Sequence, residues 1–195
     1  MIRSGTQVTG DIINSSKKLR IIGRAGVGVD NVDVKAATQK GVLVVNSPGG
    51  NTIAAAEHTI AMMLALSRNI PIANSSTFLG KWERKKFVGN ELFKKKLGVV
   101  GLGKIGTHVA KVANALGMDV YGYDPFVSSE RAQQLQVKLS ELKTLFAESD
   151  YVTLHLPRTS ETENLVDMKV LKSMKRNAKL INLSLIHISE PTRPY

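Results

Sequence analysis

The chain has 195 residues and no cysteine; 43% of its residues are hydrophobic, 22% are charged, and its formal net charge is +11. These values are typical of a globular chain that forms one large domain, or one domain and part of another. The absence of cysteine excludes a disulfide framework, cysteine-ligated zinc and a thiol nucleophile, and no metal is predicted. Because no apolar run reaches about 18 residues, we expect no membrane partner.

The positive charge is concentrated between residues 79 and 98, which carry seven basic side chains and two acidic ones. Three explanations remain open for this segment: a solvated surface, a site for an anionic small molecule, or a nucleic-acid interface. Trp82, Phe87 and Phe93 are interleaved with its lysines, but no RRM, KH or zinc-finger pattern surrounds them. We therefore expect no nucleic-acid partner.

Short β-rich runs alternate with helical runs along the chain, a pattern typical of an α/β fold with a parallel sheet. Residues 19–23 (LRIIG) and 42–46 (VLVVN) predict the first two strands. Between these strands, Asp33 is placed to cap a helix, and Gly41 follows Lys40 at a position where helices commonly end.

The middle of the chain predicts a long helix from Asn51 to about Arg68. Apolar residues surround this helix almost completely, so we expect it to be packed between two bodies. Ile70 and Pro71 then favour a helix end or a kink. A second helix is predicted over residues 72–82, and the basic segment follows it as a crossing segment.

From Lys96 onward, strands and helices alternate regularly. The predicted strands cover residues 97–101, 118–123, 151–156 and 180–183, with a brief strand near Val137. The predicted helices cover residues 105–116, 128–134, 139–147 and 168–174. Ser140 is the expected N-cap of the helix over residues 139–147.

Residues Gly101 to Gly106 read GLGKIG, the G-x-G-x-x-G pattern of a dinucleotide-binding turn between a strand and a helix. Gly101 makes the tight turn, Gly103 lets the backbone approach a pyrophosphate, and Gly106 lets the helix and strand pack closely. The helix N-terminus offers free N–H groups to the phosphates. Asp124 ends the next predicted strand, where a carboxylate accepts hydrogen bonds from ribose hydroxyls and repels a 2′-phosphate. NAD is therefore predicted rather than NADP, the alternative being ordinary turn glycines and a capping aspartate.

Several segments in a fixed order resemble one known family. They are GRAGVGVDNVD from Gly23, VNSP from Val45, Asn51 with AAAEH at residues 54–58, GKWER from Gly80, and the glycine pattern. Over about residues 1–184 they resemble the D-isomer-specific 2-hydroxyacid dehydrogenases. The resemblance implies two α/β domains with the active site between them.

The same resemblance implies where the domains lie. Residues 1–50 are expected to be part of a flavodoxin-like substrate domain. Residues 51–184 are expected to form a Rossmann-type, doubly wound parallel sheet that lacks its last strands. Relative to the family, we expect both ends to be truncated, and residues 185–195 to be foreign to the fold, with a genuine spliced tail as the alternative.

Within the family, the resemblance is greatest to members that oxidise 3-phosphoglycerate to 3-phosphohydroxypyruvate with NAD, the first committed step of serine synthesis. It implies a small phosphorylated acid as substrate, a homodimer or homotetramer, and a cytoplasmic location, or a plastid one if a transit peptide precedes the chain. Two alternatives remain: a sibling that acts on glyoxylate, hydroxypyruvate or D-lactate, and a non-enzymatic NAD-sensing protein similar to corepressors of this fold.

The resemblance also assigns binding residues. The substrate contacts are Arg3, Arg24, Gly26, Val27, Gly28 and Arg84, where Arg84 is expected to reach a neighbouring subunit's site. The cofactor contacts are Val27, Gly101, Gly103, Lys104, Ile105, Gly106, Asp124, Leu156 and Pro157. His155 lies beside these residues, but the family's catalytic base comes from a later segment.

The catalytic residues of the family have no match in this chain. The family continues after KLINLS (residues 179–184) with Arg-Gly-Gly, and that arginine is catalytic, whereas Leu185 stands at its position here. The segments that carry the family's glutamate and histidine are also absent. No catalytic residue is therefore assigned, and we expect the 195-residue chain not to turn over 3-phosphoglycerate.

Overall fold

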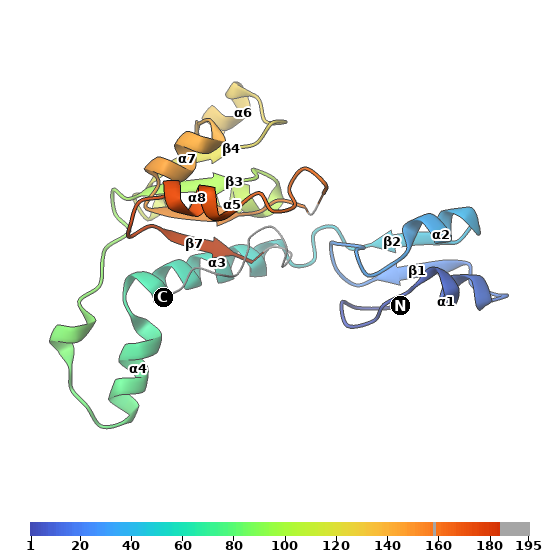
Figure 1. Cartoon of the computed structure of the whole chain (residues 1–195), viewed down its shortest axis with the longest axis horizontal. Helices are drawn as coiled ribbons and strands as arrows, with labels where there is room; N and C mark the ends of the chain where they lie inside the picture. Colours follow the sequence, from blue (N-terminus) through green and yellow to red (C-terminus); the bar gives the residue numbers. More distant parts are fainter. Residues whose placement is uncertain (158, 184–195) are drawn as a thin grey trace. The chain divides into compact units, whose positions relative to one another are not determined.

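The structure is a computed structural model that describes residues 1–157 and 159–183. The chain forms two compact units, Met1–Ile53 and a second unit that begins at Ala54 (Figure 1). Among the described residues, none of the helices combines the length and the apolar character needed to cross a membrane.

The first unit contains two parallel strands joined through a helix. Its elements are α1 (Gly10–Ser15), β1 (Ile21–Arg24), α2 (Val34–Gln39) and β2 (Leu43–Asn46). The predicted cap is confirmed, because the Asp33 carboxylate accepts a hydrogen bond of 2.9 Å from the backbone N–H of Ala36. Gly41 has a φ of 70° directly after α2, as expected at a helix end.

The hydrogen bonds of Lys40 and a small apolar core hold the first unit together. Lys40 donates three hydrogen bonds from Nζ to the carbonyl oxygens of Ile13, Asn14 and Ser16, at 2.5 to 2.7 Å. These bonds satisfy carbonyl groups at the end of α1 that would otherwise lack partners. The buried residues of this core are Val8, Ile13, Ile22, Val32, Ala36, Ala37 and Val42.

The second unit is a five-stranded parallel sheet in the order β5-β4-β3-β6-β7. Its strands are β3 (Lys96–Val100), β4 (Asp119–Tyr123), β5 (Lys138–Leu139), β6 (Tyr151–Leu154) and β7 (Lys179–Asn182). Its helices are α3 (Thr52–Ser67), α4 (Ile70–Phe78), the 3-10 helix η1 (Arg84–Phe87), α5 (Lys104–Ala115), α6 (Ser129–Gln134), α7 (Leu142–Glu148) and α8 (Met168–Ser173). The order has β3 at the centre and crossovers on both sides, which confirms the predicted Rossmann-type fold.

Both faces of this sheet are covered by helices. Side chains alternate along β3, so that Leu97 and Val99 pack with α3 and α5, whereas Val100 packs with α7. In β6, Tyr151 lies on the first of these faces, and Val152 and Leu154 lie on the second. Such two-sided burial explains why these strands read as nearly continuous apolar runs in the sequence.

Helix α3 buries one stripe of its apolar surface. Ala56, Ile60 and Met63 are buried against the sheet, whereas Met62 and Leu66 on its other side are 38% and 42% exposed. That the helix lies between two bodies stays a prediction.

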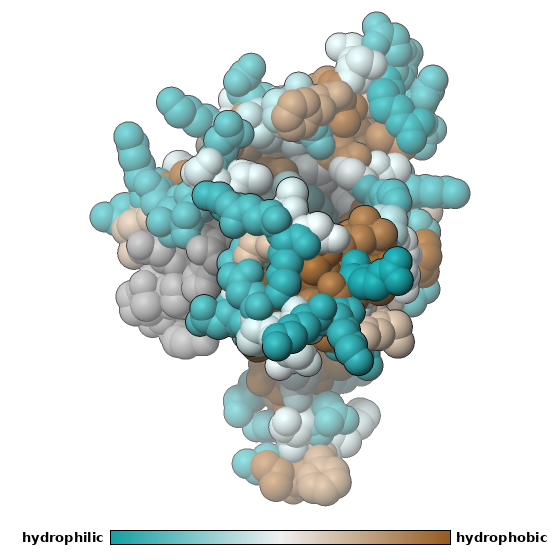
Figure 2. Space-filling model, turned by 90° about the vertical axis from the view of Figure 1, so that its right-hand side faces the viewer, coloured by the Kyte–Doolittle hydropathy of each residue, from teal (hydrophilic) through white to brown (hydrophobic). Residues whose placement is uncertain are grey.

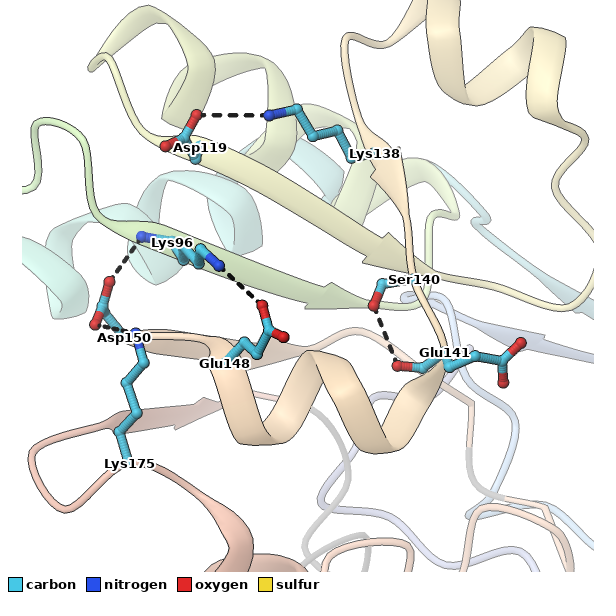
Figure 3. A network of polar contacts seen from close by, with 8 residues as sticks. All are labelled: Lys96, Asp119, Lys138, Ser140, Glu141, Glu148, Asp150 and Lys175. Atoms are coloured by element: carbon cyan, nitrogen blue, oxygen red, sulfur yellow. Dashed lines mark hydrogen bonds and ion pairs between the residues drawn. The ribbon is translucent and has the colours of Figure 1, made fainter.

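Two sequence predictions of element ends were wrong. Ser140 is not a helix cap: its backbone N–H bonds to the carbonyl of Gly122 at 3.0 Å, because the chain continues extended beside β4. Helix α7 begins only after Glu141, as Figure 3 shows. Helix α4 begins at Ile70 with Pro71 in its first turn, where proline is tolerated, and it ends at Phe78 rather than residue 82.

Candidate functional site

The glycine turn after β3 is held at the carboxyl end of the sheet. Gly101 has a φ of 94°, and its N–H donates to the carbonyl of Tyr123 at 2.8 Å. A Cβ at Gly101 would lie 2.6 Å from the carbonyl oxygen of His155, and a Cβ at Gly106 would collide with the carbonyl of Gly101. Only glycine fits at these two positions, because the backbones of three elements meet there.

The start of α5 is open to a ligand. Among residues 1–157 and 159–183, no atom beyond Gly103 and its two chain neighbours lies within 4 Å of the position that a Cβ on Gly103 would take, and Gly103 caps the helix without a side-chain hydrogen bond. Helix α5 is 12 residues long, so its dipole and first N–H groups favour an anionic group at this end. The Lys104 side chain is exposed there. The Ile105 side chain packs against the core, so Ile105 offers a ligand only its backbone.

Asp124 lies beside the glycine turn. Its Oδ2 accepts a hydrogen bond of 2.8 Å from the N–H of Leu102, and its Oδ1 accepts one of 2.9 Å from the N–H of Phe126. Each carboxylate oxygen has two lone pairs, so the half-buried group keeps acceptor capacity for hydroxyls. The predicted ribose acceptor and the predicted pyrophosphate turn are therefore adjacent.

His155 follows β6 on the same edge of the sheet. Its Nε2 lies 2.9 Å from Oγ1 of Thr153, and burial lowers the pKa of His155 to about 4. The imidazole is therefore neutral at neutral pH and is oriented by one hydroxyl. We therefore interpret His155 as a structural residue beside the glycine turn.

The segment after β6 is fixed by a threonine that the sequence analysis did not assign. Oγ1 of Thr162 donates to the carbonyl of Pro157 at 2.7 Å and accepts from the N–H of Thr159 at 2.8 Å. Leu156 and Pro157, predicted to contact the cofactor, therefore lie at the start of a braced loop, beyond the strand end at Leu154. Two threonines shortly after a strand are the signal that would have indicated such a turn.

In the first unit, the structure brings Arg3 and Arg24 onto neighbouring segments. The N–H of Ile2 donates to the carbonyl of Gly23 at 2.8 Å, and the N–H of Ala25 donates to the carbonyl of Ile2 at 2.9 Å. The segment that carries Arg3 therefore runs as an extra extended piece beside the end of β1. Two arginines separated by 20 residues in the sequence thus share one edge of this unit.

Asn31, within the GRAGVGVDNVD segment, holds that arrangement together. Its side chain is 3% exposed, and its Nδ2 donates to the carbonyl of Arg3 at 2.9 Å and to that of Thr6 at 2.6 Å. The role of this asparagine is not apparent from the sequence. It positions the backbone of Arg3 relative to the loop after β1.

The loop after β1 carries the remaining predicted substrate contacts. The guanidinium of Arg24 lies against Gly26, where a Cβ would collide with it. Nε of Arg24 is buried and has no hydrogen-bond partner among residues 1–157 and 159–183. Asn46 donates to the carbonyl of Val27 at 2.6 Å, which ties the loop, with Gly28 next in the chain, to the end of β2. Buried donors without a partner are uncommon in proteins.

Two further positions named in the sequence analysis are Arg84 and Leu185. Arg84 begins η1 in the second unit and is exposed. Nearby, Glu83 accepts hydrogen bonds of 2.8 Å from both Lys86 and Ser76, and the Lys86 bond, followed by the Ser76 bond, lowers the pKa of Glu83. Leu185, the position of the family's catalytic arginine, lies outside the residues that the structure describes.

The family is decided by a comparison with family models. Residues 60–185 match the NAD-binding domain of the D-isomer specific 2-hydroxyacid dehydrogenases. The chain belongs to this family. The match covers the five-stranded sheet, the glycine turn and Asp124, and it confirms the predicted NAD cofactor.

Relatives of established name agree with this assignment. The chain is 60% identical over 184 residues to D-3-phosphoglycerate dehydrogenase of Synechocystis, covering 94% of this chain and 33% of that protein. The structure is also similar to the apo-structure of D-lactate dehydrogenase from Escherichia coli (TM-score 0.88, 31% identity, 97% of this chain and 60% of that one). D-lactate dehydrogenase from Aquifex aeolicus, solved with NAD and lactic acid, matches with a TM-score of 0.85 and 30% identity over 94% of this chain and 55% of that one. The chain thus spans about a third of the length of the curated relative.

The residues present suit NAD. The open space at Gly103 admits a pyrophosphate, the helix start supplies N–H donors, and Asp124 supplies an acceptor one hydrogen bond away from the turn. These observations on the fold agree with the family assignment.

Proposed function

We propose that this chain is part of an NAD-dependent dehydrogenase that oxidises D-3-phosphoglycerate to 3-phosphohydroxypyruvate. The observation that supports the proposal is that Arg3 and Arg24 lie on neighbouring segments of the first unit, because Ile2 forms a bridge with Arg24 at the end of β1. Guanidinium groups bind phosphate and carboxylate oxygens in a bidentate geometry. The name of the Synechocystis relative supports the same substrate.

The two arginines favour a phosphorylated acid over the smaller acids of sibling enzymes. A monocarboxylate such as lactate or glyoxylate presents one anionic group, whereas 3-phosphoglycerate presents a carboxylate and a phosphate. Nε of Arg24, buried without a partner among the described residues, would bind an oxygen of the substrate. The backbone N–H groups of Gly26, Val27 and Gly28 are proposed to bind the carboxylate.

For the cofactor, we propose a division of roles along the carboxyl edge of the sheet. The turn over Gly101, Gly103 and Gly106 holds the pyrophosphate together with the backbone of Lys104 and Ile105. Asp124 holds the adenosine ribose. Leu156 and Pro157, in the loop braced by Thr162, and Val27 contact the cofactor further along. When bound, NAD accepts the hydride removed from the substrate.

Binding to the 195-residue chain tests the substrate directly. Titration with D-3-phosphoglycerate, followed by backbone amide chemical shifts, should perturb residues 2–6 and 24–28. D-glycerate, which lacks the phosphate, should bind at least about tenfold more weakly. Arg3→Gln should abolish this difference, whereas Arg20→Gln, at an exposed arginine just before β1, should preserve it. Equal affinities for the two acids would overturn the proposal.

We propose that turnover requires residues beyond those described. Leu185 in place of the family's arginine predicts that the 195-residue chain oxidises no 3-phosphoglycerate. The measurement is NADH absorbance during incubation of the purified chain with NAD and D-3-phosphoglycerate. A rate above the protein-free background would contradict this prediction.

We also propose that the protein forms at least a homodimer through the segment from α4 to η1. Four apolar side chains there are largely exposed: Phe78 at 90%, Leu79 at 70%, Trp82 at 86% and Val88 at 78%. Figure 1 shows α4 and the chain after it projecting away from the five-stranded sheet. Clustered exposed aromatic residues are typical of protein interfaces. Sedimentation of Trp82→Lys should show a monomer where the parent chain shows a dimer.

A further inference from the structure

A pocket opens at the amino edge of the five-stranded sheet, opposite the glycine turn. It lies between the segment before β3 and the turn before β7, and the start of β6 forms its base. Its volume is about 310 Å³. The lining residues are Asn90, Lys95, Asp150, Tyr151, Lys175, Arg176, Asn177, Ala178 and Lys179.

The parallel sheet explains why these residues meet. Parallel strands all begin at the same edge, so the residues before β3 and β7 lie on either side of the residues before β6. The register pairs Tyr151 with both Leu97 and Lys179. A strand of five residues separates this edge from the glycine turn by about 16 Å, so NAD does not account for the pocket.

Four of the lining side chains are basic. Lys175 forms an ion pair of 2.8 Å with Asp150, the one carboxylate in the lining. Lys95, Arg176 and Lys179 form no ion pair with the residues that the structure describes. Lys96, from the same edge, pairs instead with Glu148 at 2.8 Å, as Figure 3 shows.

Asp150 organises the pocket without cancelling its charge. Oδ2 of Asp150 accepts from the backbone N–H of Lys96 at 2.9 Å, and Oδ1 accepts from Nζ of Lys175 at 2.8 Å (Figure 3). Burial opposes the ionisation of Asp150, but the hydrogen bonds from Lys175 and Lys96 outweigh it and lower its pKa. The charge of Lys95 also favours the Asp150 carboxylate. With one carboxylate against four basic side chains, the lining keeps an excess of positive charge for a ligand.

We propose that this pocket binds a small phosphate-bearing anion at a site separate from the NAD and substrate sites. The three cations come from the segment before β3 and from the turn and first residue of β7. They suit a dianion with several acceptor oxygens, whereas a single carboxylate would need fewer cations. Asn90 and Asn177 add amide donors to the lining. The volume falls in the range of small-molecule sites, so it has room for a short carbon skeleton besides the phosphate.

The basic segment of the sequence contributes Lys95 to this pocket. Lys95 belongs to the cluster between residues 79 and 98 for which an anion site was one of three explanations. The fold joins it to Arg176 and Lys179, some 80 residues later in the chain. This proposal is independent of the proposed function, because it uses none of the residues assigned to NAD or 3-phosphoglycerate.

Amide chemical shifts of the 195-residue chain test the pocket. Inorganic phosphate and glycerol 3-phosphate are titrated separately, with sodium chloride at equal ionic strength as the reference. Both phosphates should perturb residues 90, 95, 150–151 and 175–179, whereas chloride should not. Tighter binding of the ester identifies a phosphorylated metabolite as the ligand type, and equal or tighter binding of inorganic phosphate identifies the free ion.

Two double variants of equal charge separate a site from a basic surface. Lys95→Gln with Arg176→Gln should raise the dissociation constant for glycerol 3-phosphate at least about fivefold. Lys169→Gln with Lys172→Gln, both exposed on α8 and outside the pocket, should change it less than about twofold. Equal losses in the two variants, shifts spread over all basic residues, or shifts confined to the glycine turn would each overturn the proposal.

Discussion

The carboxylate of Asp124 accepts a hydrogen bond of 2.8 Å from the backbone N–H of Leu102, inside the glycine turn. This bond joins the acidic residue after β4 to the loop after β3. Its consequence is that the proposed ribose acceptor and the proposed pyrophosphate cradle are held as one unit. Preorganisation of this kind lowers the entropic cost of binding a dinucleotide.

Asp124→Asn is expected to weaken NAD binding about tenfold. An amide keeps the shape of the carboxylate but turns one acceptor into a donor, so the N–H of either Leu102 or Phe126 loses its partner. Loss of the negative charge should also raise the affinity for NADP relative to NAD. Titrations with NADH and NADPH, followed by nucleotide fluorescence, measure both effects. An unchanged preference for NADH would contradict the role given to Asp124.

The glycines of the turn should differ in their tolerance of alanine. Gly106→Ala places a methyl group against the carbonyl of Gly101, so it should lower the free energy of unfolding by at least about 2 kcal/mol. The methyl group of Gly103→Ala meets no atom of the described residues within 4 Å beyond its own chain neighbours, so this variant should keep nearly the same thermal midpoint while it weakens NAD binding. Thermal denaturation and NADH titration of both variants provide the comparison. Two variants of equal stability would contradict the geometry of this turn.

His155 should make the stability of the chain dependent on pH. Its pKa is lowered to about 4 by burial, so between pH 6.5 and 4 the unfolded chain binds a proton that the folded chain excludes. Lowering the pH from about 7.5 to about 5 should therefore reduce the free energy of unfolding by about 2 kcal/mol. Above about pH 7 this contribution is complete and constant.

Urea unfolding at several pH values, with matched histidine variants, checks this dependence. His155→Asn should flatten the profile between about pH 7.5 and about pH 5, because no titrating group remains at that position. His108→Gln, on α5, should keep the slope of the parent chain. A parent profile without a slope in this range would show that His155 is not buried as described.

Lys40 should stabilise the first unit beyond the contribution of an ordinary surface lysine. Lys40→Met keeps most of the side-chain volume but removes three hydrogen bonds to the end of α1, at a cost of about 1–2 kcal/mol. Lys17→Met, at an exposed position before β1, should cost less than about 0.5 kcal/mol. Hydrogen exchange of the α1 amides reports the loss locally. Equal protection in the two variants would refute the capping role.

Local signals were sufficient for much of the fold. The glycine turn, the Asp33 cap and the alternation of strands with helices follow from short-range chemistry, and all three occur in the structure. The prediction of a helix cap at Ser140 was wrong because of a tertiary interaction. Pairing with β4 keeps the chain extended at Ser140, although serine locally favours a helix cap. The N-cap tendency of serine cannot reveal that a neighbouring strand competes for its backbone.

Apart from the local bonds of Thr162, the contacts that could not be predicted from the sequence are long-range. Asn31 bonds to the carbonyls of Arg3 and Thr6, more than 20 residues away, and Lys40 bonds to the end of α1. The basic pocket joins Lys95 to Arg176 only because their strands begin at one edge. Periodicity and spacing carry no information on such pairs.

The proposed function is tested most directly by the substrate preference of a longer form of the protein that carries residues 1–183 and turns over substrate. The measurement is kcat/KM with NAD for D-3-phosphoglycerate and for D-glycerate, which differ only by the phosphate. Because a phosphate bound by Arg3 and Arg24 contributes in the transition state, we predict a ratio of at least about 100 in favour of D-3-phosphoglycerate. A ratio near one, or faster turnover of D-lactate, would contradict the account.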